Sequence, residues 1–95
     1  MKSKVLVTGG AVRLGRAIVL HLARRGYDIA LHYGTSEESA KQTVDEVRKL
    51  DVRCKTYSAN FTNFNAIASL MDRVRVDFDL IELLVNSAAN FIQKN

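Results

Sequence analysis

The chain alternates between two hydrophobic periodicities. Apolar runs typical of buried strands lie at residues 4–8, 28–33, 53–58 and 80–86. Between these runs, apolar side chains recur at helical spacing over residues 14–25, 36–49 and 67–78. The pattern therefore predicts strands that are separated from one another by single helices.

The predicted helices have recognisable ends. Gly26 directly follows the first helical segment, where a glycine commonly ends a helix. Ser36 precedes the acidic residues Glu37 and Glu38 and is expected to cap the second helix. A turn at residues 60–63 precedes the third helix, whose expected buried face is formed by Ile67, Leu70, Met71, Val74 and Phe78.

Strict alternation of strands and helices predicts a parallel sheet. Parallel neighbours need a crossover connection, and right-handed crossovers place helices on both faces of the sheet. For a doubly wound sheet that starts in this way, the strands in chain order take the spatial order 3-2-1-4. The expected fold class is α/β, a Rossmann-type doubly wound parallel sheet.

The predicted fourth strand, residues 80–86, is almost wholly apolar. This composition is typical of a central strand that is buried on both faces. With no strand beyond it, the segment would form an open sheet edge, which natural proteins normally protect. We therefore expect residues 1–95 to be one partial domain, the front part of a larger sheet whose catalytic half is not in this chain.

A glycine-rich turn at residues 8–16 joins the first strand to the first helix. Backbone N–H groups at a helix start bind anions, and glycine lets a phosphate approach closely, so the turn predicts a phosphate cradle. Its spacing is T-G-x-x-x-R-x-G, with Arg13 where a glycine is expected in dinucleotide-binding turns. The positive charge of Arg13 is unfavourable at the positive end of the helix dipole, and a bound anion would compensate both. The alternative is that its side chain simply reaches solvent.

The end of the second strand distinguishes between two nicotinamide cofactors. Sites for NAD place an acidic residue there to bind the ribose hydroxyl, but residues 32–36 contain none. Arg13 and the hydroxyls of Thr35 and Ser36 could bind a 2′-phosphate, which favours NADP. The alternatives are that Thr35 and Ser36 only cap the helix and that His32 is a structural strand residue.

Composition changes this picture little. The 95 residues are 47% hydrophobic and 25% charged, with a net charge of +4 and no Asp or Glu among residues 1–27. The basic residues lack the aromatic platform or recognition helix of a nucleic-acid binder, so a small phosphorylated ligand is expected.

No segment has the length of a membrane span or the pattern of a signal peptide. The single cysteine, Cys54, is expected in the core and suits the cytoplasm. No cluster of side chains predicts a metal site.

Three motifs, at residues 8–15, 31–36 and 84–91, resemble the short-chain dehydrogenase/reductase family, in register over essentially the whole chain. Within it, the chain is most similar to the pteridine reductase branch. The features shared with that branch are Arg13, the His-Tyr-x-x-Ser run that begins at His32, and Phe91 after the fourth strand.

The resemblance implies a role for residues at each turn. Those expected to bind NADP are Gly9, Arg13, Leu14, Gly15, His32, Tyr33, Thr35, Ser36, Asn60, Phe61, Asn86, Ser87 and Ala88. Asn60 stands where the family usually has an aspartate that binds the adenine amino group, and its amide oxygen could accept the same bond. Ser87 replaces the second asparagine of the family's Asn-Asn-Ala-Gly motif. Arg13 and Phe91 are also expected to bind substrate, with Phe91 stacking on a pterin; the alternative is an apolar residue that starts the next helix.

The family's catalytic Tyr-x-x-x-Lys pair is missing from these residues. None of the three tyrosines is followed four residues later by a lysine. The chain is therefore expected to be the cofactor-binding part of an NADPH-dependent reductase of C=N or C=O groups, inactive alone, and a tetramer by resemblance when complete. The alternatives are an oxoacyl-carrier-protein or sugar reductase of the same family, or a non-catalytic nucleotide-binding module.

Overall fold

The computed structural model describes residues 3–87, whose strands form one parallel sheet. The strands are β1 (Lys4–Thr8), β2 (Asp28–Tyr33), β3 (Cys54–Ser58) and β4 (Leu83–Asn86). They lie in the order β3-β2-β1-β4, so the predicted order 3-2-1-4 is confirmed.

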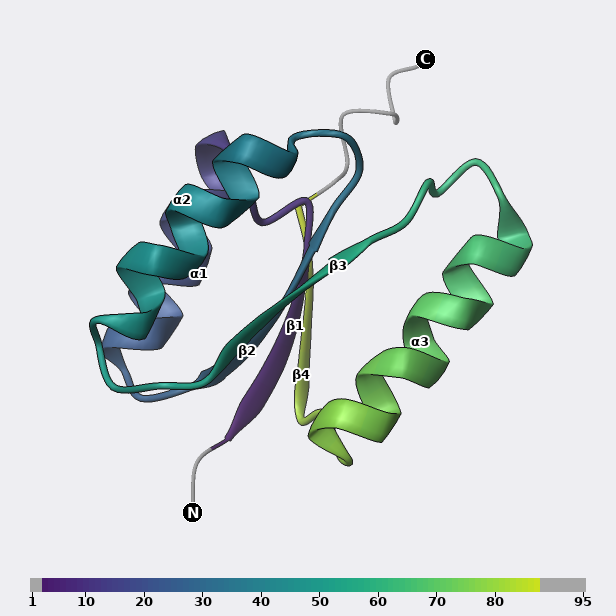
Figure 1. The fold of residues 1–95 in the computed structure, drawn as a ribbon. Coiled ribbons are helices and arrows are strands. Elements are labelled where there is room, and N and C mark those ends of the chain that lie inside the picture. Colours follow the sequence, from purple (N-terminus) through teal and green to yellow (C-terminus); the bar gives the residue numbers. More distant parts are fainter. Residues whose placement is uncertain (1–2, 88–95) are drawn as a thin grey trace.

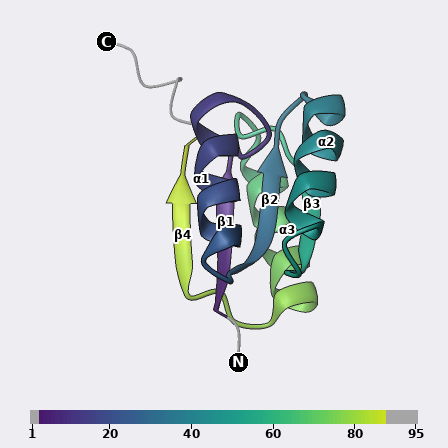
Figure 2. The same ribbon diagram turned by 90° about the vertical axis from the view of Figure 1, so that its left-hand side faces the viewer.

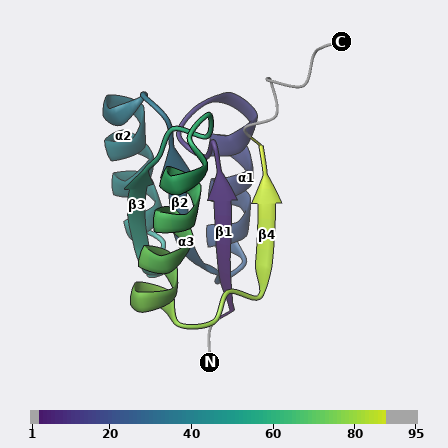
Figure 3. The ribbon, with the colours of Figure 1, turned by 90° about the vertical axis from the view of Figure 1, so that its right-hand side faces the viewer.

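Helices cover the sheet on both faces (Figure 1). Helices α1 (Arg13–Arg24) and α2 (Glu37–Arg48) lie side by side on one face (Figure 2). Helix α3 (Phe64–Phe78) lies on the other face (Figure 3). The chain therefore has the three-layer α/β arrangement of a Rossmann-type domain.

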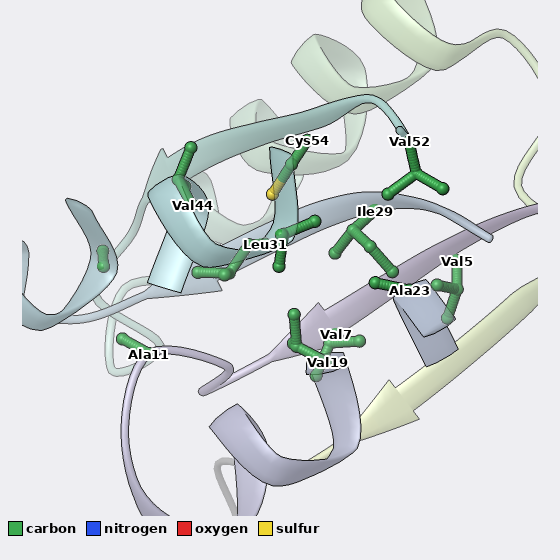
Figure 4. Packing of buried hydrophobic residues seen from close by; sticks show 12 residues of the cluster. Val5, Val7, Ala11, Val19, Ala23, Ile29, Leu31, Val44, Val52 and Cys54 are labelled. Atoms are coloured by element: carbon green, nitrogen blue, oxygen red, sulfur yellow. The ribbon is translucent and has the colours of Figure 1, made fainter. Parts of the chain in front are cut away.

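The core between the sheet and helices α1 and α2 is built from aliphatic side chains that alternate along the strands. Val5 and Val7 of β1 and Ile29 and Leu31 of β2 are fully buried on this face. Figure 4 shows Val7 beside Val19 of α1. Cys54 lies in the same cluster and is buried, which confirms it as a core residue.

The opposite face of the sheet packs against α3. Leu6 of β1 lies in a cluster with Leu70, Val74 and Phe78 of the helix, and all four are buried. Met71 was predicted on the same face, but 39% of it is exposed. Its neighbour Leu70 takes the position nearest the sheet, because the helix needs only a narrow apolar stripe to cover these strands.

Strand β4 is shorter than predicted and is not buried on both faces. Residues 80–82 form a loop before Leu83. Two hydrogen bonds hold this loop: the Glu82 N–H donates to the Lys4 carbonyl, and the Lys4 N–H donates to the Glu82 carboxylate. Leu84 pairs with Leu6 but is 59% exposed, because α3 does not extend over β4 (Figure 3). Within residues 3–87, this strand is an open sheet edge, as expected.

The sequence predicted some of the contacts that end the helices and not others. Gly26 adopts a φ of 94° after α1, and the N–H groups of Gly26 and Tyr27 bond back to the last turn, so the predicted glycine stop is confirmed. Ser36 precedes α2, but its side chain makes no capping hydrogen bond. Asn63 caps α3 by accepting from the N–H groups of Asn65 and Ala66, a cap that the sequence reading missed.

Two kinds of feature are absent from the part of the chain that the structure describes. No helix there is long and apolar enough to cross a membrane. No group of three or more His, Cys, Asp or Glu side chains is placed to hold a metal ion within the same residues.

Candidate functional site

A cleft of about 1080 Å³ opens at the carboxyl ends of β1, β2 and β3. Parallel strands bring their carboxyl ends to one edge of the sheet, so the loops that follow them meet there. The glycine turn after β1, residues 33–36 after β2 and residues 59–62 after β3 all line the cleft. Ligands of open α/β sheets bind at this edge, which makes the cleft the candidate site.

The glycine turn contributes Gly9, Arg13, Leu14 and Gly15 to the cleft. Gly9 has a φ of 66°, a conformation that favours glycine. A β-carbon on Gly15 would collide with the carbonyl of Gly9 and lie 2.6 Å from the Ser87 hydroxyl oxygen. Gly15 is therefore required by the close packing of α1 on the end of β1.

Arg13 also has a left-handed backbone, with a φ of 55°. This conformation costs an ordinary residue about 1 kcal/mol or more relative to glycine. Arg13 is exposed and lines the cleft at the start of α1. A contact of the Arg13 side chain must therefore offset the conformational cost of this backbone, and a bound anion would provide such a contact.

His32 holds the glycine turn in place. Its Nδ1 atom accepts a hydrogen bond of 3.0 Å from the Gly9 N–H, and its backbone carbonyl accepts one from the Gly10 N–H. Its Nε2 atom lies 2.9 Å from the Ala59 carbonyl oxygen. Because Nδ1 accepts, Nε2 carries the proton and donates to Ala59, so the ring is neutral.

Both ring nitrogens of His32 are thus engaged within the protein. His32 is 3% exposed, and its ring stacks on Phe61, with 4.2 Å between the ring centroids. This arrangement fits the interpretation of His32 as a structural strand residue better than a direct contact with a phosphate. His32 acts on the cleft by joining the loops after β1 and β3.

We expect the protein to lose stability as the pH falls below about 6.5. Burial lowers the pKa of His32 from its ordinary value of 6.5, and the hydrogen bond to Ala59 opposes this effect only in part. The unfolded chain therefore binds the proton more readily, so stability is complete above pH 6.5 and falls as the pH drops through the lowered pKa. Urea unfolding of the wild type across this range measures the effect.

His21 offers a matched control for this prediction, because it is exposed on α1. The variant His21→Asn is expected to keep the pH dependence, whereas His32→Gln is expected to lose it and to be less stable at neutral pH. Loss of the pH dependence in His21→Asn would contradict the assignment to His32.

Two further side chains hold the carbonyl groups of the glycine turn. The Ser87 hydroxyl donates to the carbonyl oxygen of Thr8 at 2.5 Å. The buried Thr43 hydroxyl of α2 lies 3.1 Å from the carbonyl oxygen of Ala11 and 2.9 Å from that of Ser39. The turn is therefore anchored by β2, by α2 and by the residue that directly follows β4.

These contacts leave the start of α1 as the source of anion-binding groups. The N–H groups of Gly9 and Gly10 are used by His32, while the first turn of a helix has N–H groups without partners in the helix. Arg16 is not available as a second cation, because it forms an ion pair with Glu46 of α2. The helix start and Arg13 together form an electropositive end of the cleft.

The loop after β2 contributes Tyr33, Thr35 and Ser36 to the cleft. The Ser36 side chain does not cap α2, so its hydroxyl remains available to a ligand. Among the described residues that line the cleft, Arg13 is the one charged side chain, and no carboxylate is present. This loop therefore has no group that would repel a phosphate.

The loop after β3 contributes Asn60 and Phe61. The Asn60 amide oxygen accepts from the backbone N–H of Thr62 at 3.0 Å and from its hydroxyl at 2.8 Å. Asn60 was expected to accept a hydrogen bond from a ligand through this oxygen. Thr62 therefore competes with a ligand for the same acceptor. Sequence reasoning missed Thr62, although an Asn side chain commonly hydrogen-bonds the backbone two residues later.

The remaining candidates lie at the end of β4 and beyond it. Ser87 lines the cleft, whereas Asn86 does not and instead accepts a 2.8 Å hydrogen bond from the Thr8 hydroxyl. Ala88 and Phe91 lie outside the described residues. Thr8 and Thr43 were also missed; the signal for Thr43 was a polar residue on the apolar face of α2.

A family model described as short chain dehydrogenase matches residues 3–95 of the chain. A 3-oxoacyl-acyl-carrier-protein reductase from Staphylococcus aureus is 33% identical over 88 residues, which cover 93% of this chain and 36% of the relative. A hydroxynaphthalene reductase from Aspergillus fumigatus is 34% identical over 83 residues, which cover 87% of this chain and 30% of the relative. The chain thus spans about a third of the length of these relatives.

Solved structures show the same likeness. A protein from Burkholderia cenocepacia that was solved with bound NADP has a TM-score of 0.85 and 31% identity, covering 90% of this chain and 33% of that one. An NAD-bound xylitol dehydrogenase has a TM-score of 0.82 and 32% identity, and the match covers 86% of this chain and 31% of the xylitol dehydrogenase. Similar folds therefore hold either nicotinamide cofactor.

Proposed function

The chain belongs to the short-chain dehydrogenase family, and from this premise we propose that it is the cofactor-binding part of an NADPH-dependent reductase. The observation that carries this proposal is the charge of the cleft, where Arg13 is the one charged side chain among the described lining residues. A carboxylate that would bind an unphosphorylated ribose is missing from the end of β2. The cleft therefore suits a phosphorylated ribose better than a free one.

The residues present fit such a cofactor. The N–H groups at the start of α1 would hold the pyrophosphate, and Gly9 and Gly15 would leave room for it. Arg13 would bind the 2′-phosphate together with the hydroxyls of Thr35 and Ser36. When bound, the cofactor supplies a hydride for the carbon of a C=O or C=N group.

The proton donor of the reaction is not among these 95 residues, which contain no Tyr-x-x-x-Lys pair. We therefore assign cofactor binding to residues 1–95 as one partial domain and place the catalytic acid elsewhere in the complete enzyme. By the same resemblance, the enzyme would be a cytoplasmic homo-oligomer that acts on a small molecule.

Two substrate classes remain as proposals. A pterin is suggested by Phe91 and Arg13, which resemble the pteridine reductase branch. An oxoacyl thioester is favoured by the relatives from Staphylococcus aureus, which are reductases of that class. Oxidation of NADPH by the complete protein with each substrate distinguishes them. Binding of NADPH without its oxidation by either would instead favour a non-catalytic nucleotide-binding module.

Ser36→Asp is expected to weaken NADPH binding at least about tenfold, equivalent to about 1.4 kcal/mol, because a carboxylate would face the 2′-phosphate. Aspartate is also a good residue before a helix, so α2 should be preserved. Fluorescence titration with NADPH and NADH measures the effect. Ser36→Asn has the same shape without the charge and should bind NADPH nearly normally; equal affinity of the two variants for NADPH would refute the placement of the phosphate.

A further inference from the structure

The side-chain amide of Asn60 has a defined orientation. Its oxygen accepts hydrogen bonds from the backbone N–H of Thr62 at 3.0 Å and from the Thr62 hydroxyl at 2.8 Å. A backbone N–H can only donate, so the atom facing it must be the amide oxygen and not the nitrogen. A carbonyl oxygen has two lone pairs, and Thr62 engages both.

The amide nitrogen of Asn60 is the polar group that remains for a ligand. Asn60 is exposed and lines the cleft, and no hydrogen bond of its nitrogen is found within residues 3–87. An amide NH₂ group can donate hydrogen bonds but cannot accept them. Position 60 therefore presents a donor at the end of β3.

The base of a dinucleotide would reach this end of the cleft. In the proposed binding mode, the pyrophosphate lies at the start of α1 and the ribose at the end of β2. The base continues in the same direction along the sheet edge, toward the loop after β3 that contains Asn60 and Thr62. The 6-amino group of adenine is a donor, whereas a 6-oxo group on a purine is an acceptor.

We propose that Asn60 presents its NH₂ group to the 6-position of the base, so that the site does not select adenine and binds a 6-oxo purine dinucleotide at least as well. This inference rests on the proposed cofactor-binding function. Two donors that face each other form no hydrogen bond, and one of them loses its contact with water. A 6-oxo group in the same place accepts directly from Asn60.

Asn60→Asp reverses the chemistry without changing the shape. One carboxylate oxygen would keep both bonds from Thr62, and the other would be an acceptor suited to a 6-amino group. Thr62→Val is a milder variant that removes the hydroxyl and retains the backbone N–H. It frees one lone pair on the amide oxygen and is expected to move the base preference part of the way toward adenine.

The test compares NADPH with reduced nicotinamide hypoxanthine dinucleotide phosphate by fluorescence titration of the full chain. The wild type is expected to bind the hypoxanthine form at least as tightly, and Asn60→Asp is expected to shift the affinity ratio at least about tenfold toward adenine. A wild type that prefers adenine about tenfold, or a ratio that changes less than about threefold in Asn60→Asp, overturns the inference.

The wild-type ratio tests the inference even if a variant fails to fold. NADH and its hypoxanthine analogue provide the same comparison without the 2′-phosphate. Failure of all four dinucleotides to bind overturns the proposed function, and the inference with it. Normal NADPH binding with the wrong base preference overturns the inference alone.

Discussion

Gly15→Ala is expected to lower the free energy of unfolding by about 3 kcal/mol or more. The added β-carbon would collide with the carbonyl group of Gly9, which belongs to the backbone and cannot move aside like the end of a side chain. It would also lie 2.6 Å from the Ser87 hydroxyl, which holds the same turn. Overpacking of a well-packed contact typically costs about 1–3 kcal/mol, and an obstacle of backbone atoms places this site at the upper end.

The effect on ligand binding follows from the same geometry. To accommodate the methyl group, the start of α1 must move away from the end of β1, which displaces the N–H groups of the proposed anion site. NADPH binding should therefore fall together with stability. Urea unfolding gives the change in stability, and titration at a temperature where the variant remains folded gives the change in binding.

Gly34→Ala provides the matched control. Gly34 also lines the cleft, but a β-carbon there would meet no atom within 4 Å. Its backbone is not in the left-handed region, so alanine should be tolerated. A Gly15→Ala variant as stable as Gly34→Ala would show that α1 is not held as closely to β1 as the structure indicates.

Arg13→Ala is expected to weaken NADPH binding by about 1–3 kcal/mol, or about 5- to 150-fold, and to leave NADH binding nearly unchanged. The reason is the loss of a charge-assisted contact with the 2′-phosphate, for which the described part of the cleft offers no second cation. Titration with both cofactors measures the difference. Equal weakening of NADPH and NADH would remove Arg13 from the 2′-phosphate.

Arg13→Gly separates the side chain from the backbone. Both variants lose the guanidinium group, so both should lose the preference for NADPH. Only glycine relieves the left-handed conformation at φ 55°, so Arg13→Gly should be more stable than Arg13→Ala by about 1 kcal/mol. Equal stability of the two variants would contradict the strain at this position.

Hydrophobic periodicity predicted the strands and the helices, and the topology of doubly wound sheets predicted the order of the strands. The periodicity did not predict the element ends that polar contacts determine. Asn63 caps the start of α3, and contacts between Lys4 and Glu82 hold residues 80–82 in a loop, so β4 begins only at Leu83. Burial of β4 could not be predicted either. The composition of a strand says which surface it can bury, whereas its exposure depends on which elements cover it.

The location of the candidate site could also be predicted, because the carboxyl ends of parallel strands share one edge of the sheet. The sequence alone therefore determined the fold, the glycine-rich turn between β1 and α1 and the absence of an acid after β2, since each depends on residues that are close in the chain. Only the tertiary structure decided the neutral state of His32, the approach of Gly15 to Gly9 and the anchoring of the turn by Ser87. These contacts depend on distances of a few ångströms between separate segments, which packing determines and no spacing along the chain encodes.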